Sequence, residues 1–387
     1  MRRELAAPPT RSETAARAIQ ACAGQDEAEY RAVGSDARVQ SSGGVIMEIR
    51  RRHVLFGVLT WVAIFGVFIV LAGPTEFIRL TSELSRSRLA GILGMNALGT
   101  ISMGLVLYTV SRGAGLNLTP VESIFLNTTV NLANNFTPFG QASGLPAGGL
   151  IMSRWTGQSF EKSVAALSMK ELVGFTPGIL VMLLGGIYIV IYDATIPERI
   201  RSVIAIFTVS IALFVLALAL VYRNPDPARG VIHWVVSTLN RGLAYVPRIS
   251  KLDESEIQER VDSFSGSMDR ISSNKPVVLV ACTLTTFATV TQGVLLWLAF
   301  GGVGVSISLA LTVFIVPVSL LASAIPSPGG SGGIEAAQIL LVFGVTGADR
   351  AAIITAVVLT RGLVYWTPIV VGSLTLTGIQ FKKWWLS

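Results

Sequence analysis

The stretch NNFTPFGQASGLPAGG, residues 134–149, is uncharged and contains four glycines and two prolines. It lies inside a longer segment, residues 121–152, that is otherwise apolar enough to enter a bilayer. In hydrocarbon, backbone N–H and C=O groups outside regular structure are tolerated only where they are buried in protein or line a water-filled cavity. We therefore predict that this interrupted segment forms part of a cavity. The alternative is a pair of proline-kinked helices whose small residues allow close packing.

Apolar runs dominate the rest of the chain. Only 14% of its 387 residues are charged, against about 25% in a soluble domain, and the mean hydropathy is +0.64. A second segment, residues 307–345, is apolar but cut by Pro and Gly like the first. Uninterrupted runs that could cross roughly 30 Å of hydrocarbon occur at about 53–72, 89–110, 163–190, 201–222, 276–300 and 351–377. The sequence predicts an all-α, polytopic transmembrane bundle with six full spans and two broken or re-entrant segments. Two crossings by each broken segment would instead give ten spans.

Four regions divide the chain. Residues 1–46 are polar and lack the apolar core of a signal peptide, so we expect a disordered tail. Met47 opens a stretch with three arginines directly before the first span, so a start of translation there is an alternative. The first transmembrane half is expected at 47–222, a cytoplasmic loop at 223–275 and the second transmembrane half at 276–387.

The distribution of positive charge predicts the orientation in the membrane. The formal net charge is +7, but the Lys and Arg residues are spread over loops and form no nucleic-acid-binding helix. Positive residues accumulate on the cytoplasmic side of membrane proteins. Arg50–Arg52 and Lys382–Lys383 therefore place both termini in the cytoplasm of a multi-pass protein of the cell (plasma) membrane. In this arrangement Arg79, Arg86 and Arg88 lie on the opposite side.

The loop at 223–275 contains a segment with apolar residues close to helical spacing. We predict an amphipathic helix on the membrane surface, and the alternative is a solvated connecting helix. The apolar positions are Leu252, Ile257, Val261, Phe264, Met268 and Ile271.

Similar sequence follows the two interrupted segments. TPFGQASG precedes TGQSFEKSVAALSMKELVGFTPG in the first half, and PSPGGSGG precedes TGADRAAIITAVVLTRGLVYWTPI in the second. The Thr-Gly pairs at 156 and 346 are 190 positions apart, whereas Lys170 and Arg361 are 191 apart, as are the Thr-Pro pairs that follow. This recurring order indicates an internal repeat. Because the halves enter the membrane from opposite faces in the predicted topology, it is an inverted repeat, and paired interrupted segments in such repeats point to a transport site.

Three ionisable residues, Lys170, Glu171 and Arg361, lie within predicted spans. A charge there costs about 2.5 kcal/mol or more and normally faces a bundle interior or a cavity. Lys170 and Glu171 are adjacent and project about 100° apart on a helix, so we expect each to have another partner. Lys170 and Arg361 lie at matching depths from opposite faces. The alternative is that both cations extend to the nearer membrane interface.

Glu335 follows PSPGGSGGI at the expected start of a helix. A carboxylate there complements the positive end of the helix dipole, while the same helix N-terminus could instead receive an anionic phosphate. Amide side chains add polar groups to the first broken segment. The candidate lipid- or substrate-binding residues are Lys170, Glu171, Arg361, Glu335, Asn134, Asn135 and Gln141. The expected break positions are Pro138, Gly140, Gly144, Pro146, Pro326, Pro328, Gly329 and Gly330.

The sequence shows no catalytic constellation. GGSGG at 329–333 fits the pattern G-x-S-x-G, but a hydrolase needs a preceding strand and a histidine after Ser331, and His53 and His233 both precede it. Two histidines and two cysteines in the whole chain do not suggest a zinc site. We expect a protein that is not an enzyme and that has no metal and no cofactor.

The sequence around both breaks resembles a known family. IPSPGGSGGIEAAQILLVFGVTGADRAAIITAVVLTRG, residues 325–362, and NNFTPFGQASGLPAGGLIMSRWTGQS, residues 134–159, resemble the two signatures of the lysylphosphatidylglycerol synthase transmembrane-region family, also described as flippase-like integral membrane proteins. The resemblance implies a bundle with inverted halves that moves lipids: aminoacylated phospholipids in bacteria and polyprenyl-linked sugars in some archaeal relatives. Many relatives carry charged residues where this chain has Leu145 and Gly148, and an aliphatic residue is usual in place of Ser331.

The leading hypothesis is translocation of a phospholipid or polyprenyl-linked lipid headgroup through a cavity built from 134–149 and 326–335. Lys170 and Arg361 would contact an anionic lipid phosphate, and the two glutamates would balance their charge. Because no soluble aminoacyl-transfer domain follows the last span, we expect no synthesis of the lipid.

An alternative is a non-catalytic membrane partner that binds a glycosyltransferase of lipid or cell-surface glycan synthesis through the 223–275 loop. A membrane-embedded transferase is a third hypothesis, although no general base or metal site supports it.

Overall fold

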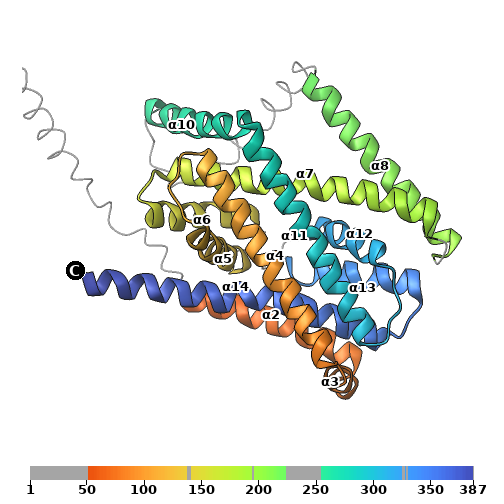
Figure 1. Ribbon diagram of the computed structural model, residues 1–387. Helices are drawn as coiled ribbons and strands as arrows, with labels where there is room; N and C mark the ends of the chain where they lie inside the picture. The colour runs from red at the N-terminus through yellow and green to blue at the C-terminus, as the bar shows by residue number, and fades with distance from the viewer. Residues whose placement is uncertain are drawn as a thin grey trace, which may run out of the picture. The chain divides into compact units, whose positions relative to one another are not determined.

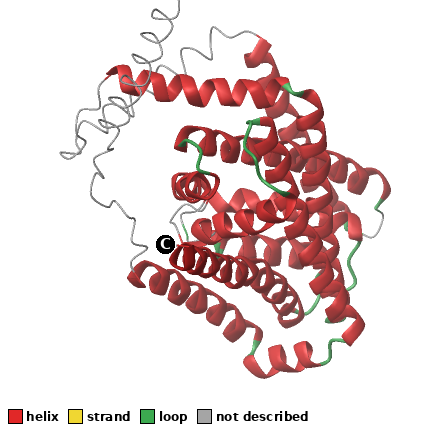
Figure 2. Cartoon of the chain, turned by 60° about the vertical axis from the view of Figure 1, so that its left-hand side comes forward, coloured by secondary structure: helices red, strands yellow, loops and turns green. Residues whose placement is uncertain are grey.

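A computed structural model of the chain describes residues 51–136, 141–193, 196–223, 254–324, 327 and 330–386 (Figure 1). Every regular element in these ranges is a helix, and none of the ranges contains a strand (Figure 2). The predicted all-α class is confirmed. Contacts divide the chain into residues 1–54 and 55–387, and all the helices except the first turn of the first one belong to the second unit.

The described helices fall into two halves. Those of the first half are α2 (Arg51–Ala72), α3 (Pro74–Ser82), α4 (Arg86–Gly113), α5 (Pro120–Phe136), α6 (Gln141–Thr156), α7 (Phe160–Tyr192) and α8 (Glu198–Arg223). Those of the second half are α10 (Glu254–Ser273), α11 (Lys275–Gly302), α12 (Leu309–Leu320), the short 3-10 helix η1 (Leu321–Ala324), α13 (Gly333–Thr346) and α14 (Arg350–Leu386).

Five helices in the described ranges are long and apolar enough to cross a membrane, namely α4, α7, α8, α11 and α14. A sixth candidate is the pair α2 and α3, which is bent by 89° at Gly73, where φ is 85°. These correspond to the six predicted full spans. In contrast, α5, α6, α12 and α13 have 17, 16, 12 and 14 residues. At 1.5 Å per residue they reach about 26 Å at most, which is less than the roughly 30 Å of hydrocarbon.

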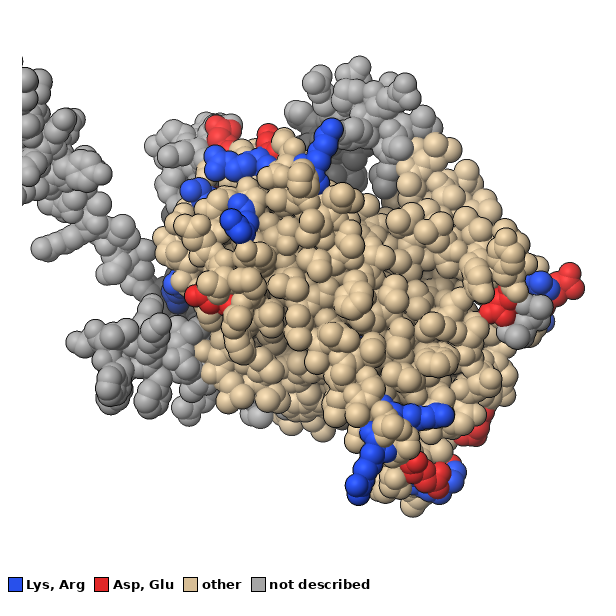
Figure 3. Space-filling view, in the orientation of Figure 1, with Lys and Arg blue, Asp and Glu red and all other residues tan. Residues whose placement is uncertain are grey.

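Charged side chains gather at the ends of the helices. In Figure 3 they surround α3, α10 and the turn between α7 and α8, and the surface between these places is almost free of charge. Large apolar side chains are exposed on the long helices, for example Leu172 and Leu184 on α7 and Ile206 on α8. This is the surface that a protein surrounded by hydrocarbon requires, because exposed polar groups would have no partners there.

The two halves share helix boundaries as well as sequence. α4 and α11 each have 28 residues and begin 189 positions apart, each after a capping side chain, Ser85 or Asn274. α5 and α12 also begin 189 positions apart, after the capping hydroxyl groups of Thr119 and Ser308. The repeat recognised around the two breaks therefore extends back over two further helices in each half.

The Thr-Gly pairs form the same turn in both halves. Gly157 and Gly347 follow the last residues of α6 and α13 with φ of 68° and 58°, a left-handed conformation that glycine adopts at little cost. In each turn the threonine hydroxyl donates to the carbonyl oxygen four residues earlier, at 2.9 and 2.8 Å, and accepts from the N–H two residues later. The correspondence between the halves thus includes individual hydrogen bonds.

The repeat is inverted because its equivalent long helices, α4 and α11, pack against each other antiparallel. Ser102 of α4 donates to the carbonyl oxygen of Leu284 in α11, at 2.8 Å, while Gly91, earlier in α4, faces Leu298, later in α11. The short helices also exchange partners: α5 packs against α14, and its equivalent α12 packs against α7. The short helix of each half therefore packs against the long helix of the other half.

The helix α10 lies against the bundle rather than only against membrane or solvent. Ile271 is fully buried, and Met268 packs in the same apolar cluster as residues of α4, α7 and α11. At this end of α10 the apolar side chains therefore face protein, and the position of the helix on the membrane surface stays a prediction. Leu252 lies outside the described residues, as do the side chains of Ile257 and Val261.

Glycines allow the closest helix contacts in both halves. A Cβ on Gly104 of α4 would lie 2.5 Å from the Cα of Ile124 in α5. A Cβ on Gly293 of α11 would lie 2.6 Å from the Cα of Val313 in α12. Both residues of the second contact are 189 positions beyond those of the first, so the same packing fixes each short helix on its long neighbour.

Replacing Gly104 or Gly293 by Ala should lower the midpoint of thermal unfolding in detergent by several degrees. The added methyl group overlaps a backbone atom, and overpacking of this kind costs about 1–3 kcal/mol. Gly94→Ala on α4 is the matched control, because no atom lies within 4 Å of a Cβ at that position. Equal midpoints for Gly104→Ala and Gly94→Ala would show that α4 and α5 are not in such close contact.

Candidate functional site: a buried arginine beside an interrupted helix

The second interrupted segment separates η1 from α13. Gly330 and Gly332 have φ of 70° and 90°, backbone conformations that residues other than glycine rarely adopt. α13 starts directly after them, at Gly333. Gly330 is thus a true break position, as predicted. Pro326, Pro328 and Gly329 lie outside the described residues.

Glu335 in the first turn of α13 has a different partner for each carboxylate oxygen. Oε2 accepts a 2.6 Å hydrogen bond from the backbone N–H of Gly332, and Oε1 accepts one of 2.8 Å from Nε of Arg361 in α14. The Glu335 side chain is 1% exposed and that of Arg361 is 13% exposed. The carboxylate therefore caps the helix and neutralises a buried cation at the same time.

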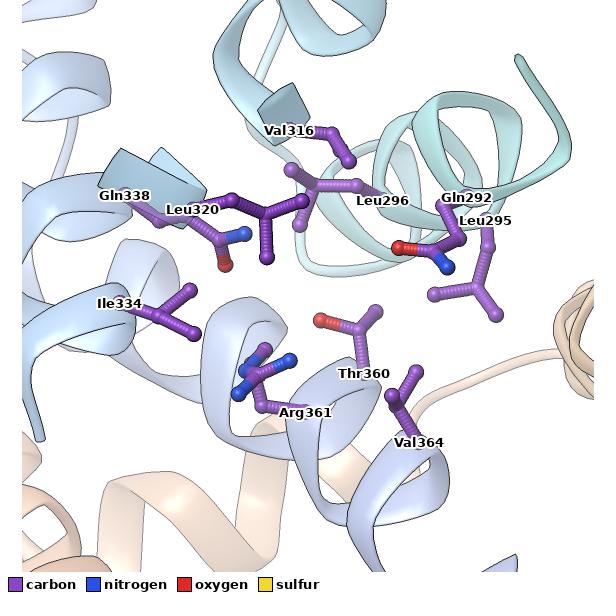
Figure 4. A pocket seen from close by; sticks show the side chains of 10 residues that line it. All are labelled: Gln292, Leu295, Leu296, Val316, Leu320, Ile334, Gln338, Thr360, Arg361 and Val364. Atoms are coloured by element: carbon purple, nitrogen blue, oxygen red, sulfur yellow. The ribbon is translucent and has the colours of Figure 1, made fainter. Parts of the chain in front are cut away.

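The guanidinium of Arg361 is held at one edge only. Glu335 binds Nε, and among the described residues neither terminal amino group has a hydrogen-bond partner. The side chain points from α14 into a small hollow between α11, α12, α13 and α14 (Figure 4). Up to four N–H donors of a fixed cation are therefore available to a group inside this hollow.

The hollow combines apolar walls with a few polar groups. Its volume of about 20 Å³ is enough for one water molecule. Figure 4 shows its lining side chains: Gln292, Leu295, Leu296, Val316, Leu320, Ile334, Gln338, Thr360, Arg361 and Val364. The Gln338 amide donates to Ser319 Oγ at 3.1 Å, but its carbonyl oxygen, though buried, has no partner in the described structure. An unpaired buried acceptor of this kind favours a polar occupant.

Gln292, Gln338 and Thr360 were not among the predicted site residues. The two glutamines carried a usable signal, because each is an amide within a strongly apolar helix. Thr360 gave none, because threonines are frequent in α14 and its hydroxyl is bonded to carbonyl oxygens of its own helix.

In the first half, Lys170 forms an ion pair with its neighbour. Nζ lies 2.9 Å from Oε1 of Glu171, and the exposed fractions of the two side chains are 2% and 16%. The prediction that each residue has another partner is wrong. Adjacent residues do project apart, but the long lysine side chain can curve back, and a low-dielectric interior strengthens the attraction. Extension to the membrane interface is also wrong for Lys170, because the side chain is enclosed by protein.

The predicted amides lie near the first break and reach the other half. Asn135 at the end of α5 donates from Nδ2 to the carbonyl oxygen of Tyr365 in α14, at 3.3 Å, and the Tyr365 hydroxyl donates back to the Asn135 carbonyl oxygen, at 3.4 Å. Tyr365 is one helical turn after Arg361. Asn134 is buried against α6, and the side chain of Gln141 lies outside the described residues.

Two of the predicted break positions in the first half are helical. Gly144 and Pro146 lie inside α6, so their assignment to a break is wrong. Gly144 instead allows close packing, because a Cβ there would overlap Asn134 of α5. In the described structure α5 ends at Phe136 and α6 begins at Gln141, and Pro138 and Gly140 are outside the described residues.

The structure does not bring the two cations into one site. Arg361 lines the hollow, whereas Lys170 belongs to α7, among the apolar residues of the first half. Of the described residues, the hollow takes Ile334 from the predicted cavity segment 326–335 and none from 134–149.

This fold and site define a multi-pass helical membrane protein with inverted halves and a buried ion pair beside an interrupted helix. The family model for the lysylphosphatidylglycerol synthase transmembrane region matches residues 56–372, and the chain belongs to this family. The resemblance seen in the sequence is confirmed. No curated protein matches the chain.

Glu335→Gln should destabilise the protein by about 3 kcal/mol, because the amide oxygen can still cap α13 but Arg361 becomes an unpaired buried charge. The double variant Glu335→Gln/Arg361→Gln should recover much of this loss. Unfolding in detergent would measure both effects. Glu76→Gln removes an exposed pairing with Arg79 and is the control, with little expected change in stability because solvent screens an exposed ion pair. If the double variant were no more stable than Glu335→Gln, coupling between the two side chains would be refuted.

Proposed function

We propose that this protein translocates the phosphate-bearing headgroup of a phospholipid or polyprenyl-linked lipid across the cell membrane without catalysing a covalent reaction. One observation carries the proposal: a buried arginine is fixed at Nε by Glu335, while its terminal amino groups line a hollow and have no hydrogen-bond partner among the described residues. Membership of a lipid-related membrane family supports it.

The chemistry of the site suits an anionic phosphate. A guanidinium offers its N–H groups in a planar fork that matches two phosphate oxygens. Because Glu335 already neutralises the cation, the energetic cost of keeping Arg361 in the bundle is met before the substrate arrives. A phosphate would then bind to the terminal amino groups of Arg361 through hydrogen bonds. Repulsion between the phosphate and Glu335 would be small, because the carboxylate faces Nε and the N–H of Gly332. The amides of Gln292 and Gln338 could bind hydroxyl or amine groups of the same headgroup.

Headgroup binding requires movement of the helices. A hollow of about 20 Å³ accommodates one water and no headgroup. We infer that α12 and η1 move away from α13 and α14 when substrate enters, and the glycine-containing break between η1 and α13 is the natural hinge. In this proposal both interrupted segments are re-entrant, from opposite faces of the plasma membrane, and both chain termini are cytoplasmic.

Arg361→Lys should reduce lipid exchange by about tenfold or more while leaving the fold stable. Lysine keeps the charge opposite Glu335 but loses the planar fork, and losing one charge-assisted hydrogen bond costs on the order of 1.5–3 kcal/mol. The measurement is dithionite quenching of fluorescent phosphatidylglycerol in vesicles of phosphatidylcholine and phosphatidylglycerol that contain the purified protein.

Two further variants make this experiment decisive. Arg361→Gln should reduce exchange at least as strongly. Arg79→Gln on α3, which alters an exposed arginine outside the hollow, should exchange lipid at the wild-type rate. Wild-type exchange by folded Arg361→Lys and Arg361→Gln would count against the proposed role, and exchange equal to protein-free vesicles for the wild type would count against the function itself.

A further inference from the structure

The first half contains buried polar groups that its own packing does not satisfy. The side chain of Asn127 in α5 is 1% exposed, and within the described structure neither its amide nitrogen nor its oxygen has a hydrogen-bond partner. Lys170 has Glu171 as its one hydrogen-bond partner among the described residues, although an ammonium group has three donors. Because a buried polar group without a partner destabilises the fold, the packing of α5 does not explain an asparagine at position 127.

The repeat relates these two residues to the Arg361 hollow. Val316 of α12 lines that hollow, and its equivalent in α5, 189 positions earlier, is Asn127. Leu320 corresponds in the same way to Asn131. Arg361 corresponds to Lys170 across the 191-position offset of the long helices. Three positions that line the hollow in the second half are therefore occupied by polar residues in the first, namely Asn127, Asn131 and Lys170.

The packing of the first half agrees with this correspondence. A Cβ on Gly148 of α6 would meet both Val130 of α5 and Leu167 of α7. α5 and α7 thus converge on the same small residue of α6, one turn from Asn127 and one turn from Lys170. In the second half, α12 and α14 likewise face each other across the hollow, with α11 and α13 at its sides (Figure 4).

We propose that Lys170 and Asn127 form a second headgroup site, the repeat-related counterpart of the Arg361 hollow, which is closed in this conformation. Because α4 and α11 run antiparallel, the counterpart opens toward the opposite side of the membrane. The spare donors of Lys170 suit an anionic oxygen, and the Asn127 amide can accept from or donate to a neighbouring polar group. The ligand class, an anionic lipid headgroup, rests on the proposed function, whereas the existence and sidedness of the site do not.

Cysteine labelling tests the existence of the site without any transport assay. Cys22 and Cys282 are first replaced by Ser, and single cysteines are introduced as Asn127→Cys, Val316→Cys and Thr129→Cys. Thr129 is the matched control, because it is fully buried on the same helix and its hydroxyl is bonded to the carbonyl oxygen of Phe125. A charged, membrane-impermeant methanethiosulfonate reagent is added to either side of vesicles in which the protein has one orientation.

Asn127→Cys should react about tenfold faster than Thr129→Cys, because even a minor open state of a few per cent exposes it. It should react from the side opposite to that which labels Val316→Cys. Reaction no faster than that of Thr129→Cys, or from the same side as Val316→Cys, would overturn the proposal. If Asn127→Cys does not fold, Asn131→Cys tests the equivalent of Leu320 with the same expectations.

The ligand class is tested by protection of Asn127→Cys. Phosphatidylglycerol in the vesicles should slow labelling relative to vesicles of phosphatidylcholine alone. Protection by inorganic phosphate but not by phosphatidylglycerol would overturn the lipid assignment and identify a site for a free anion. Labelling from the opposite side together with lipid exchange by the wild type no faster than in protein-free vesicles would leave the second site standing and refute the proposed function.

Discussion

The carboxylate of Glu335 fixes both the end of an interrupted helix and a buried cation. In a membrane interior, neither the first N–H groups of a helix nor a guanidinium can rely on water. By accepting from Gly332 with one oxygen and from Arg361 with the other, Glu335 satisfies both demands. The bond to Gly332 requires the left-handed glycine conformations of the break, and the bond to Arg361 places α13 against α14. The break, the capped helix and the orientation of the guanidinium therefore depend on one another.

Much of the fold could be predicted from the sequence, because membrane spans depend mainly on the length and composition of apolar runs. The repeat was visible where it carries rare residues, such as Thr-Gly turns and cations within spans. It was invisible along α4 and α11, where equivalent positions share packing rather than residue type and only Gly104 and Gly293 mark the common contact. The glycines of NNFTPFGQASGLPAGG were ambiguous, because glycine occurs both where a helix is interrupted and where two helices pack closely. Gly144 proved to serve packing, and Gly330 the break.

The charged residues of the candidate site could be predicted from the sequence, but their pairing could not. Arg361 and Glu335 were recognised because charged residues in spans are costly, but spacing along the chain gives no information on a contact 26 positions apart. For Lys170 and Glu171 the sequence argued against a pairing that the structure contains. Helical geometry places adjacent residues on different faces, but the flexible lysine side chain overcomes that separation. Gln292 and Gln338 become meaningful only when α11 and α13 meet around the hollow.

The two halves neutralise equivalent cations in different ways, and this difference bears on how the molecule can move. The carboxylate of the second half comes from α13, whose equivalent position in α6 is Leu145, whereas that of the first half comes from α7 itself. Separation of α6 from α7 leaves the Lys170–Glu171 pair intact. Separation of α13 from α14 must break the Arg361–Glu335 pair. The buried guanidinium then loses its carboxylate, and the carboxylate that caps α13 loses its cation. An inverted repeat whose halves were identical would open equally readily on both sides. Here the charge distribution makes α6 the easier helix to displace, while α13 stays attached to α14 and keeps the guanidinium oriented.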